Sequence, residues 1–338
     1  MKNYVVWILL MGLLSCQLSA QELIDKVQID FTGIEKVNVR GAFCKTEFYA
    51  SSGDALSLEG EIRGLRKYED IRIRHSQEGS LLEVWIEHPR NVNDQLRGYL
   101  VFNLPRDTEI NVVTLSGSII LKGVGYNKTF IETLSGAVAV EGAITPLEIK
   151  SSSGSVSAKS LQGDVSINTI SGGITIEDAK SSCSASSVSG SINASELAGG
   201  IKAATTSGGI TAQGVSGKGE AKSVSGSIKF SDVKGSIEAT SSSGSIQLSE
   251  ISGSVAANTV SGTISGDGIY LKDSSSFKST SGSIEVLLAN KQEDLSFDLR
   301  STSGRLSIFG KTGSKQMLEG QGQIKVIGVT TSGSQRYK

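Results

Sequence analysis

A serine followed by a glycine recurs through the later two-thirds of this chain at a nearly constant interval. From Gly136 to Gly262, the residue numbers of successive glycines of this kind always differ by 18. A fixed period of this size indicates stacked copies of one structural unit rather than a single folded core. The glycines of the pattern are Gly117, Gly136, Gly154, Gly172, Gly190, Gly208, Gly226, Gly244, Gly262, Gly282, Gly304 and Gly333.

Apolar residues recur at fixed positions when each unit is numbered from its glycine as position 0. They stand at +2, +4 and +7, and the same set returns at +11, +13 and +16, so each unit consists of two pseudo-equivalent nonapeptides. In the unit of Gly154 they are Val156, Ala158, Leu161, Val165, Ile167 and Ile170. We expect all six to point inward, and the same holds for Val188 and Val260, which occupy position +16 in other units.

Two apolar residues two positions apart are typical of a strand with one buried face, and the following step of three requires a bend. No stretch sustains the spacing of an amphipathic helix. The sequence therefore predicts an all-β, single-stranded β-solenoid of about 18 residues per coil, with two short strands per coil and a cap at each end. Coils about 4.8 Å apart would stack into a rod of about 40 Å. We expect each repeat glycine to take a corner conformation closed to residues with a Cβ.

Residues 1–20 are typical of an export signal. Lys2 precedes an apolar run from Val5 to Leu14, and Leu18-Ser19-Ala20 suits cleavage before Gln21. The run is too short to span a membrane as a helix. Ordinary cleavage is the favoured interpretation. The alternative is a lipobox ending in Cys16, whose lipidation would be the only membrane attachment that we expect.

The remaining chain divides into three parts, which are residues 21–105, 106–285 and 286–338. The first holds charged, alternating strands, and its Trp85, Tyr99 and Phe102 are expected to cover the first hydrophobic rung as a cap. The second is the regular solenoid. In the third the repeat loosens around insertions at 289–294 and 311–323, between which strands are predicted at 295–299 and 306–308.

Charge and cysteine content exclude several classes of function. Removing Lys2 with the signal takes the net charge from −1 to −2, which leaves no electrostatic basis for binding nucleic acid or an anionic membrane. Cys44 and Cys183 would remain, and Cys183 stands at an inward position. A small buried thiol is therefore favoured over a disulfide, and no metal-type spacing of cysteines exists.

The motif Ser-Gly-Ser-Ile occurs at 116–119, 189–192, 225–228 and 281–284, and a related segment leads to Gly304. In these motifs the chain resembles the bacterial putative-adhesin families of unknown function with DUF4097-like β-solenoid domains, over roughly residues 100–310. The resemblance implies an exported protein like a single-stranded β-helix. It carries over no catalytic residues.

Three candidate chemistries can be weighed from the residues. Some β-helices cleave polysaccharides, but the only histidines, His75 and His88, lie in the N-terminal part, and a serine nucleophile in the repeats would lack a histidine base. The Gly-Gly-x-Gly-x-Asp pattern of calcium-binding β-rolls is absent. Position +6 holds a row of acids that could bind cations, although lysines two positions beyond favour a solvated edge; its members are Asp178, Glu196, Asp232 and Glu250.

The third candidate is a hydroxyl face formed by positions −1, +1 and +15, which are nearly all Ser, Thr or Gly. A regular polar surface on a rigid rod could bind glycans through many weak contacts. The alternative is a purely structural role, in which serine suits tight corners and keeps the rod soluble. Residues that exemplify the face are Thr169, Ser171, Gly173, Ser187, Ser189 and Ser191.

The sequence thus favours a non-enzymatic, extracytoplasmic interaction scaffold with glycans or cell-surface proteins as partners. We expect no catalytic, cofactor-binding or metal-binding residue and no cofactor. The alternative function is an envelope polysaccharide-processing enzyme with a site near the N-terminal cap.

Overall fold

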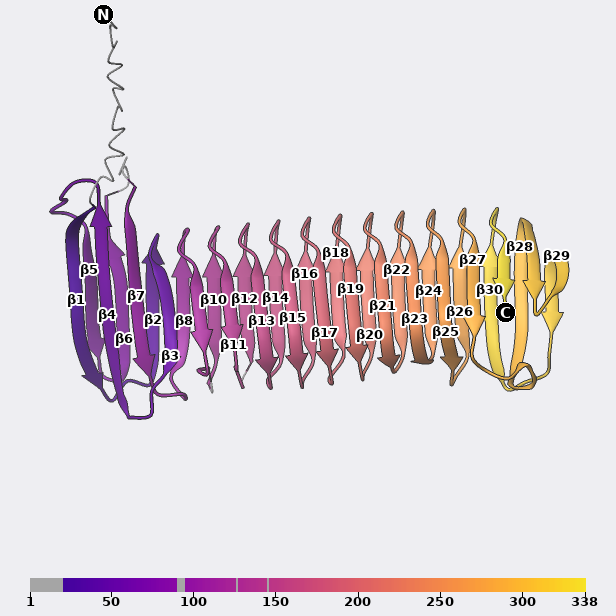
Figure 1. Cartoon of the computed structure of the whole chain (residues 1–338), viewed down its shortest axis with the longest axis horizontal. Helices are drawn as coiled ribbons and strands as arrows, with labels where there is room; N and C mark the ends of the chain where they lie inside the picture. The colour runs from indigo at the N-terminus through magenta and orange to yellow at the C-terminus, as the bar shows by residue number, and fades with distance from the viewer. Residues whose placement is uncertain (1–20, 90–94, 126, 145) are drawn as a thin grey trace, which may run out of the picture.

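The computed structural model describes residues 21–89, 95–125, 127–144 and 146–338. The export signal and Cys16, both predicted within residues 1–20, lie outside the described residues. The molecule is an elongated β-solenoid, with the N-terminal strands at one end and the last strands at the other (Figure 1). The predicted all-β solenoid is confirmed, and its coils stack along the long axis.

Each regular coil contributes one strand to each of two parallel layers. The strand that begins near +11 belongs to the first layer, which contains β8 (Glu109–Thr114), β10 (Thr129–Thr133), β12 (Leu147–Ser151), β14 (Val165–Thr169), β16 (Cys183–Ser187), β18 (Ile201–Thr205), β20 (Gly219–Ser223), β22 (Ile237–Ser241), β24 (Val255–Thr259) and β26 (Ser275–Ser279).

The strand that begins at +2 belongs to the second layer. Its members are β9 (Ile119–Lys122), β11 (Val138–Glu141), β13 (Val156–Leu161), β15 (Ile174–Ala179), β17 (Ile192–Leu197), β19 (Ile210–Val215), β21 (Ile228–Lys234), β23 (Ile246–Gly253), β25 (Ile264–Leu271) and β27 (Ile284–Leu288). Within this layer each strand pairs in parallel with the equivalent strand of the next coil.

The register of these pairs preserves the sequence repeat. Val156 pairs with Ile174, Ile174 with Ile192, and Ile192 with Ile210. Equivalent side chains therefore lie above one another in single files, as the period predicted. In the coil that begins at Gly154, positions +2, +4, +7, +11 and +13 are all buried in one core that runs the length of the rod. This stacking supplies the apolar contacts that a single coil could not make alone.

The N-terminal residues continue both layers beyond the first regular coil. Their strands are β1 (Glu22–Thr32), β2 (Lys36–Ala42), β3 (Lys45–Ala50), β4 (Ala55–Gly64), β5 (Arg72–Glu78), β6 (Leu81–Glu87) and β7 (Arg97–Leu104). The first layer runs β8–β2–β6–β5, and the second runs β9–β3–β7–β4–β1. Rung order therefore departs from chain order here, and antiparallel strands end both layers.

The predicted aromatic cap is only partly right. Phe102 is buried and stacks on Phe48, with ring centroids 4.8 Å apart. Trp85 and Tyr99 instead alternate with buried neighbours and are only half-buried. They point away from the core because their strands are paired into the layers, and the Tyr99 hydroxyl donates a hydrogen bond to Glu59.

The C-terminal end also departs from chain order. After β26 and β27 the next rung is formed by β30 (Ile324–Thr330) and β31 (Gln335–Tyr337), and only then by β28 (Leu295–Ile308). A 3₁₀ turn, η1 (Gln292–Asp294), precedes β28. The final strand is β29 (Lys311–Glu319), which pairs antiparallel with β28. Figure 1 shows this order at the yellow end.

The C-terminal prediction is right that both segments are strand, but it misses their continuity and the strand that follows. The segments 295–299 and 306–308 belong to one long strand, β28, which bends and pairs with β30 and then β31. Most of the supposed insertion at 311–323 is strand β29, which covers the last rung. The sequence repeat could not reveal either feature, because the pairing partners come from non-equivalent segments.

Candidate functional site

The corner at each repeat glycine is built on a buried hydroxyl at position −3, which is +15 of the preceding unit. Ser187 Oγ accepts a hydrogen bond from the Gly190 N–H at 2.8 Å, and Thr205 Oγ1 accepts one from Gly208 at 3.0 Å. Thr169 Oγ1 instead donates to the Gly172 carbonyl at 2.7 Å. These bonds satisfy polar backbone atoms that the corner would otherwise leave buried and unpaired.

The prediction that position +15 belongs to an exposed hydroxyl face is therefore wrong. Thr169 and Ser187 are buried, as are their equivalents in the other coils. The prediction for position +16 is wrong as well, because Ile170, Val188 and Val260 are exposed rather than inward. The inward position goes to the residue that can bond the glycine backbone, and the next residue is consequently turned outward.

The glycines are required by close stacking. A Cβ on Gly190 or Gly208 would meet the carbonyl oxygen of the glycine one coil earlier, well inside contact distance. None of the repeat glycines from Gly136 to Gly282 has the positive φ that the sequence prediction implied. Steric closure by the preceding coil, rather than a special backbone conformation, therefore excludes larger residues here.

We define the Ser-Gly edge as the residues at −2 and −1 of the ten glycines from Gly117 to Gly282. A serine occupies −1 in every coil, and none of the twenty positions holds a charged residue. Six of the −2 residues are aliphatic and between 48% and 56% exposed. They are Leu115, Leu134, Ile170, Val188, Val224 and Val260. The other four are Ser152, Thr206, Ser242 and Thr280.

This edge combines an apolar row with a hydroxyl row along the length of the regular coils. Single exposed aliphatic side chains are common, but six of them along one edge, interrupted only by Ser or Thr, mark an interaction surface. The apolar residues at −2 recur in the sequence, but the periodic pattern predicts that they belong to the core rather than to an exposed row. Position +1 extends the polar surface beside the edge, where Ser191 is exposed and the Thr263 hydroxyl donates to Ser245.

The acidic row at +6 lies near the end of the second-layer strands, where the chain bends into the opposite corner of the coil. Asp178, Glu196, Asp232 and Glu250 all have φ between 49° and 57°, and Gly214 takes the same left-handed conformation within the row. The Asp178 carboxylate lies 2.5 Å from the Lys180 ammonium, and this hydrogen bond holds the pKa of Asp178 below its usual value. The pair agrees with the solvated edge that the sequence favoured. The described residues contain no cluster of three or more potential metal ligands.

The two histidines pack against different aromatic side chains in the N-terminal part. His75 packs edge-on against Phe31, with ring centroids 5.5 Å apart. His88 packs against Phe43, and its Nδ1 lies 3.0 Å from the Pro89 carbonyl oxygen. These contacts give both imidazoles a packing role within the N-terminal strands.

Both cysteines of the described chain are free and buried. Burial raises the pKa of the Cys183 thiol to about 11 and that of Cys44 to about 12. The thiols are consequently protonated near neutral pH and poorly reactive. The prediction of a small buried thiol at Cys183 is confirmed.

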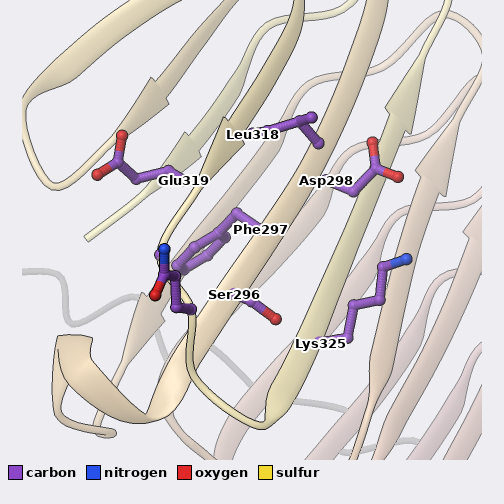
Figure 2. A pocket seen from close by; sticks show the side chains of 8 residues that line it. Ser296, Phe297, Asp298, Leu318, Glu319 and Lys325 are labelled. Atoms are coloured by element: carbon purple, nitrogen blue, oxygen red, sulfur yellow. The ribbon is translucent and has the colours of Figure 1, made fainter.

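A hollow of about 450 Å³ lies at the C-terminal end, between β28, β29 and β30. Figure 2 shows Asp298 and Lys325 on one side of Phe297 and Glu319 on the other. Arg300 bonds both carboxylate oxygens of Asp298 at 3.1 Å and is the main cause of its lowered pKa. Lys311 pairs with Glu319. These acids already have cationic partners, so the hollow offers no free acid–base pair.

Comparison with known families identifies the fold. The family model described as Toastrack DUF4097 matches residues 106–213 and 197–337, which together make up more than half of the chain. The chain belongs to the Toastrack DUF4097 family. The resemblance drawn from the Ser-Gly-Ser-Ile motifs is thereby confirmed. The match includes the whole regular part of this Toastrack solenoid and its C-terminal rungs.

Two solved structures are similar to this Toastrack chain in part. One is a putative cell adhesion protein from Clostridium sporogenes, at 10% identity and a TM-score of 0.19, covering 93% of this chain and 99% of the other. The second is a putative adhesin from Bacteroides fragilis, at 14% identity and a TM-score of 0.26, covering 93% and 100%. Such scores do not establish a common overall shape.

No match to this chain was found among the curated proteins. Within the described residues, no helix has the length and apolar character needed to cross a membrane.

Proposed function

We propose that this chain is a non-enzymatic, exported β-solenoid that acts as an adhesin-like or envelope interaction scaffold. The Ser-Gly edge is its contact surface. The observation that carries the proposal is the uncharged edge, in which a row of serines runs through all ten coils and exposed aliphatic side chains lie beside it in six of them. Six large aliphatic side chains in one row lose contact with water when a partner covers them, which favours association.

The parallel register gives this surface its second property. Equivalent residues repeat at the spacing of one strand, about 4.8 Å, so a long partner meets the same groups many times. Many weak contacts in series give useful avidity without a deep pocket. Glycans and cell-surface proteins are the partner classes that an uncharged, partly apolar edge suits. The proposed export signal of residues 1–20 would direct the scaffold out of the cytoplasm, with lipidation of Cys16 as the alternative to ordinary cleavage.

The test uses residues 21–338 in a glycan-array screen and in a binding assay on intact bacterial and host cells. A triple variant, Val188→Ser with Val224→Ser and Val260→Ser, removes half of the aliphatic row without touching the core. We expect it to lose most of the binding. The matched control is Tyr270→Ser, which removes a side chain of similar exposure elsewhere. Equal binding by the triple variant and the wild type would reject the edge as the contact surface.

The alternative function is an envelope polysaccharide-processing enzyme with a site near the N-terminal cap. If the protein bound no glycan on the array and yet cleaved an oligosaccharide, the enzyme function would be favoured over the scaffold function. In that case His75→Gln and His88→Gln would be the first variants to assay, since these are the only histidines of the chain.

A further inference from the structure

The outward face of the first layer carries a distinct group of side chains near the N-terminal end. Four neighbouring strands, in the order β6, β2, β8 and β10, bring them together in two rows. One row reads Trp85, Arg40, Val113 and Glu132, and the other reads Glu83, Asn38, Asn111 and Phe130. We call these eight residues the N-terminal platform. It lies on a sheet face, apart from the Ser-Gly edge.

Two aromatic rings stand at opposite ends of the platform. Trp85 and Phe130 are half-buried and alternate with buried residues of their strands, so they point outward. Three strand spacings separate their strands, which amounts to about 14 Å. A cation lies near each ring: Arg40 Cζ is 5.9 Å from the Trp85 centroid, and Lys150 Nζ is 5.1 Å from that of Phe130. Partly exposed rings with a polar neighbour are common at binding surfaces.

The strands between the rings carry unpaired amide oxygens. Asn38 and Asn111 are directly opposite each other on β2 and β8. The Oδ1 atom of each is shielded from solvent and has no hydrogen-bond partner. Such atoms are rare in folded proteins and call for a donor that the protein itself does not supply. A ligand with hydroxyl groups that lay across the two strands would provide donors at this point, after a small rotation of each amide.

A hollow of about 220 Å³ continues the platform toward the next coils. Glu132, Lys150 and Asn168 line it on the sheet face, and Ser152 and Ile170 line it on the side of the Ser-Gly edge. It therefore adjoins Phe130 through Lys150, which contacts both. The small residue at Ser152 opens the hollow, because Leu134 and Ile170 occupy the equivalent position in the adjacent coils.

The local charge decides which ligand suits this surface. Arg40, Arg72, Arg74 and Lys150 contribute four positive charges on or beside the platform. Four carboxylates offset them, namely Glu83, Glu87, Glu132 and Glu148, so the sum is zero. A polyanion such as a nucleic acid would require a net positive surface. An uncharged saccharide has apolar faces for the rings and hydroxyl edges for amides and carboxylates.

We propose that the N-terminal platform and the hollow beside it bind an uncharged oligosaccharide, with Trp85 and Phe130 stacking on sugar rings and Asn38, Asn111, Glu132 and Asn168 bonding hydroxyl groups. The site goes beyond the proposed scaffold function, because its binding residues lie on the outward sheet face and only Ser152 and Ile170 of the Ser-Gly edge border it. It would recognise a short stretch of sugar units, whereas the edge makes repeated contacts with a long partner.

The chain offers a direct reporter. Its two tryptophans are Trp7 and Trp85, so residues 21–338 contain Trp85 as the sole tryptophan. The experiment titrates this protein with cellohexaose, chitohexaose and mannohexaose while the emission of Trp85 is recorded. We expect a saturable change with at least one of them. Phe130→Ala retains the reporter and should weaken the affinity by about tenfold.

Controls separate this site from folding and from the edge. Ile120→Ala changes an outward residue of β9 on the opposite face and should leave the affinity unchanged. The triple edge variant should also keep the Trp85 response, so the two proposals can fail independently. Circular dichroism checks that Phe130→Ala is folded, and Asn168→Ala serves as a second variant on the same surface. Heparin, a polyanion, is titrated in the same way. The proposal is overturned if no hexasaccharide gives saturation, if both site variants bind like the wild type, or if heparin alone binds.

Discussion

The two corners of each coil obey different rules, although both turn the chain between the same two layers. The Ser-Gly corner holds glycine in every coil because a Cβ would strike the carbonyl oxygen of the previous coil. The opposite corner requires a left-handed φ at +6, yet it accepts Ser160, Asp178, Glu196 or Gly214. Left-handed backbone costs an L-residue about 1–2 kcal/mol and remains possible, whereas overlap with a neighbouring backbone does not.

At these two corners the invariant glycine marks backbone contact between coils, and the variable residue at +6 marks a local backbone conformation. A glycine that only relieves strain can be replaced at modest cost. A glycine against which the next coil is stacked sets the rise of the whole rod. Substitutions at the two corners should therefore differ in size.

The largest effect is expected for Gly208→Ala. The new methyl group would meet the backbone of Gly190, so the coils must separate, and the free energy of unfolding should fall by about 3 kcal/mol or more. Gly209→Ala is the matched control, since its Cβ would have only an ordinary contact with Ser227. Denaturant unfolding should show a change within about 0.5 kcal/mol for the control. Equal losses in the two variants would contradict the steric explanation for the repeat glycine.

A smaller loss is expected when the buried hydroxyl of the Ser-Gly corner is removed. Ser187→Ala leaves the Gly190 N–H without its acceptor and deprives Thr169 of a neighbour 2.9 Å away. An unpaired buried N–H costs about 1–3 kcal/mol. Ser189→Ala, at the exposed −1 position of the same corner, should change the stability little. Calorimetric melting of both variants makes the comparison.

At the opposite corner a substitution should stabilise the protein. Glu196→Gly relieves the left-handed strain but adds freedom to the unfolded chain, so we expect a net gain of about 0.5 kcal/mol. Gly214→Ala makes the reverse change in the next coil and should cost a similar amount. A loss of more than about 2 kcal/mol for Gly214→Ala would mean that this corner is sterically closed as well.

The smallest effect concerns the ion pair beside the opposite corner. Lys180 lowers the pKa of Asp178, so the folded state binds this proton less readily than the unfolded state. The contribution of the pair is therefore present above the ordinary carboxyl pKa and is lost as pH falls through the lowered value. The free energy of unfolding is measured for Lys180→Met and for the wild type. The difference between the two should shrink on acidification from about pH 6 to pH 2. A difference that grew instead would contradict the pairing.

The sequence predicts the regular coils well because each inward position repeats along one file. Ile174, Ile192 and Ile210 are aligned by the period alone, and the parallel register follows from it. Hydrophobicity points to the wrong one of positions +15 and +16. The buried residue at +15 is a serine or threonine bonded to local backbone, and the apolar residue at +16 is exposed. Ile170 was assigned to the core for that reason, and the exposed row was missed.

The strand order at the two ends of the rod could not be predicted from the sequence, for another physical reason. Rungs there form between segments far apart in the chain, such as β26 with β30 and β2 with β8. No period links these segments, so their order depends on long-range packing. The N-terminal platform could not be predicted for the same reason, since Trp85 and Phe130 share one sheet face only through the strand order β6, β2, β8 and β10.

The central claim is that each coil of the repeat advances the chain by one strand spacing along a straight axis. Pairs of nitroxide labels test it, placed at Ser157 and at Asn193, Lys229 or Ser265, which are outward residues two, four and six coils away. In a protein of residues 21–338 both native cysteines, Cys44 and Cys183, are buried, so introduced cysteines label selectively. Pulsed electron–electron resonance should give backbone separations that rise linearly, at about 10, 19 and 29 Å. Separations that level off or fall with sequence distance would contradict a solenoid.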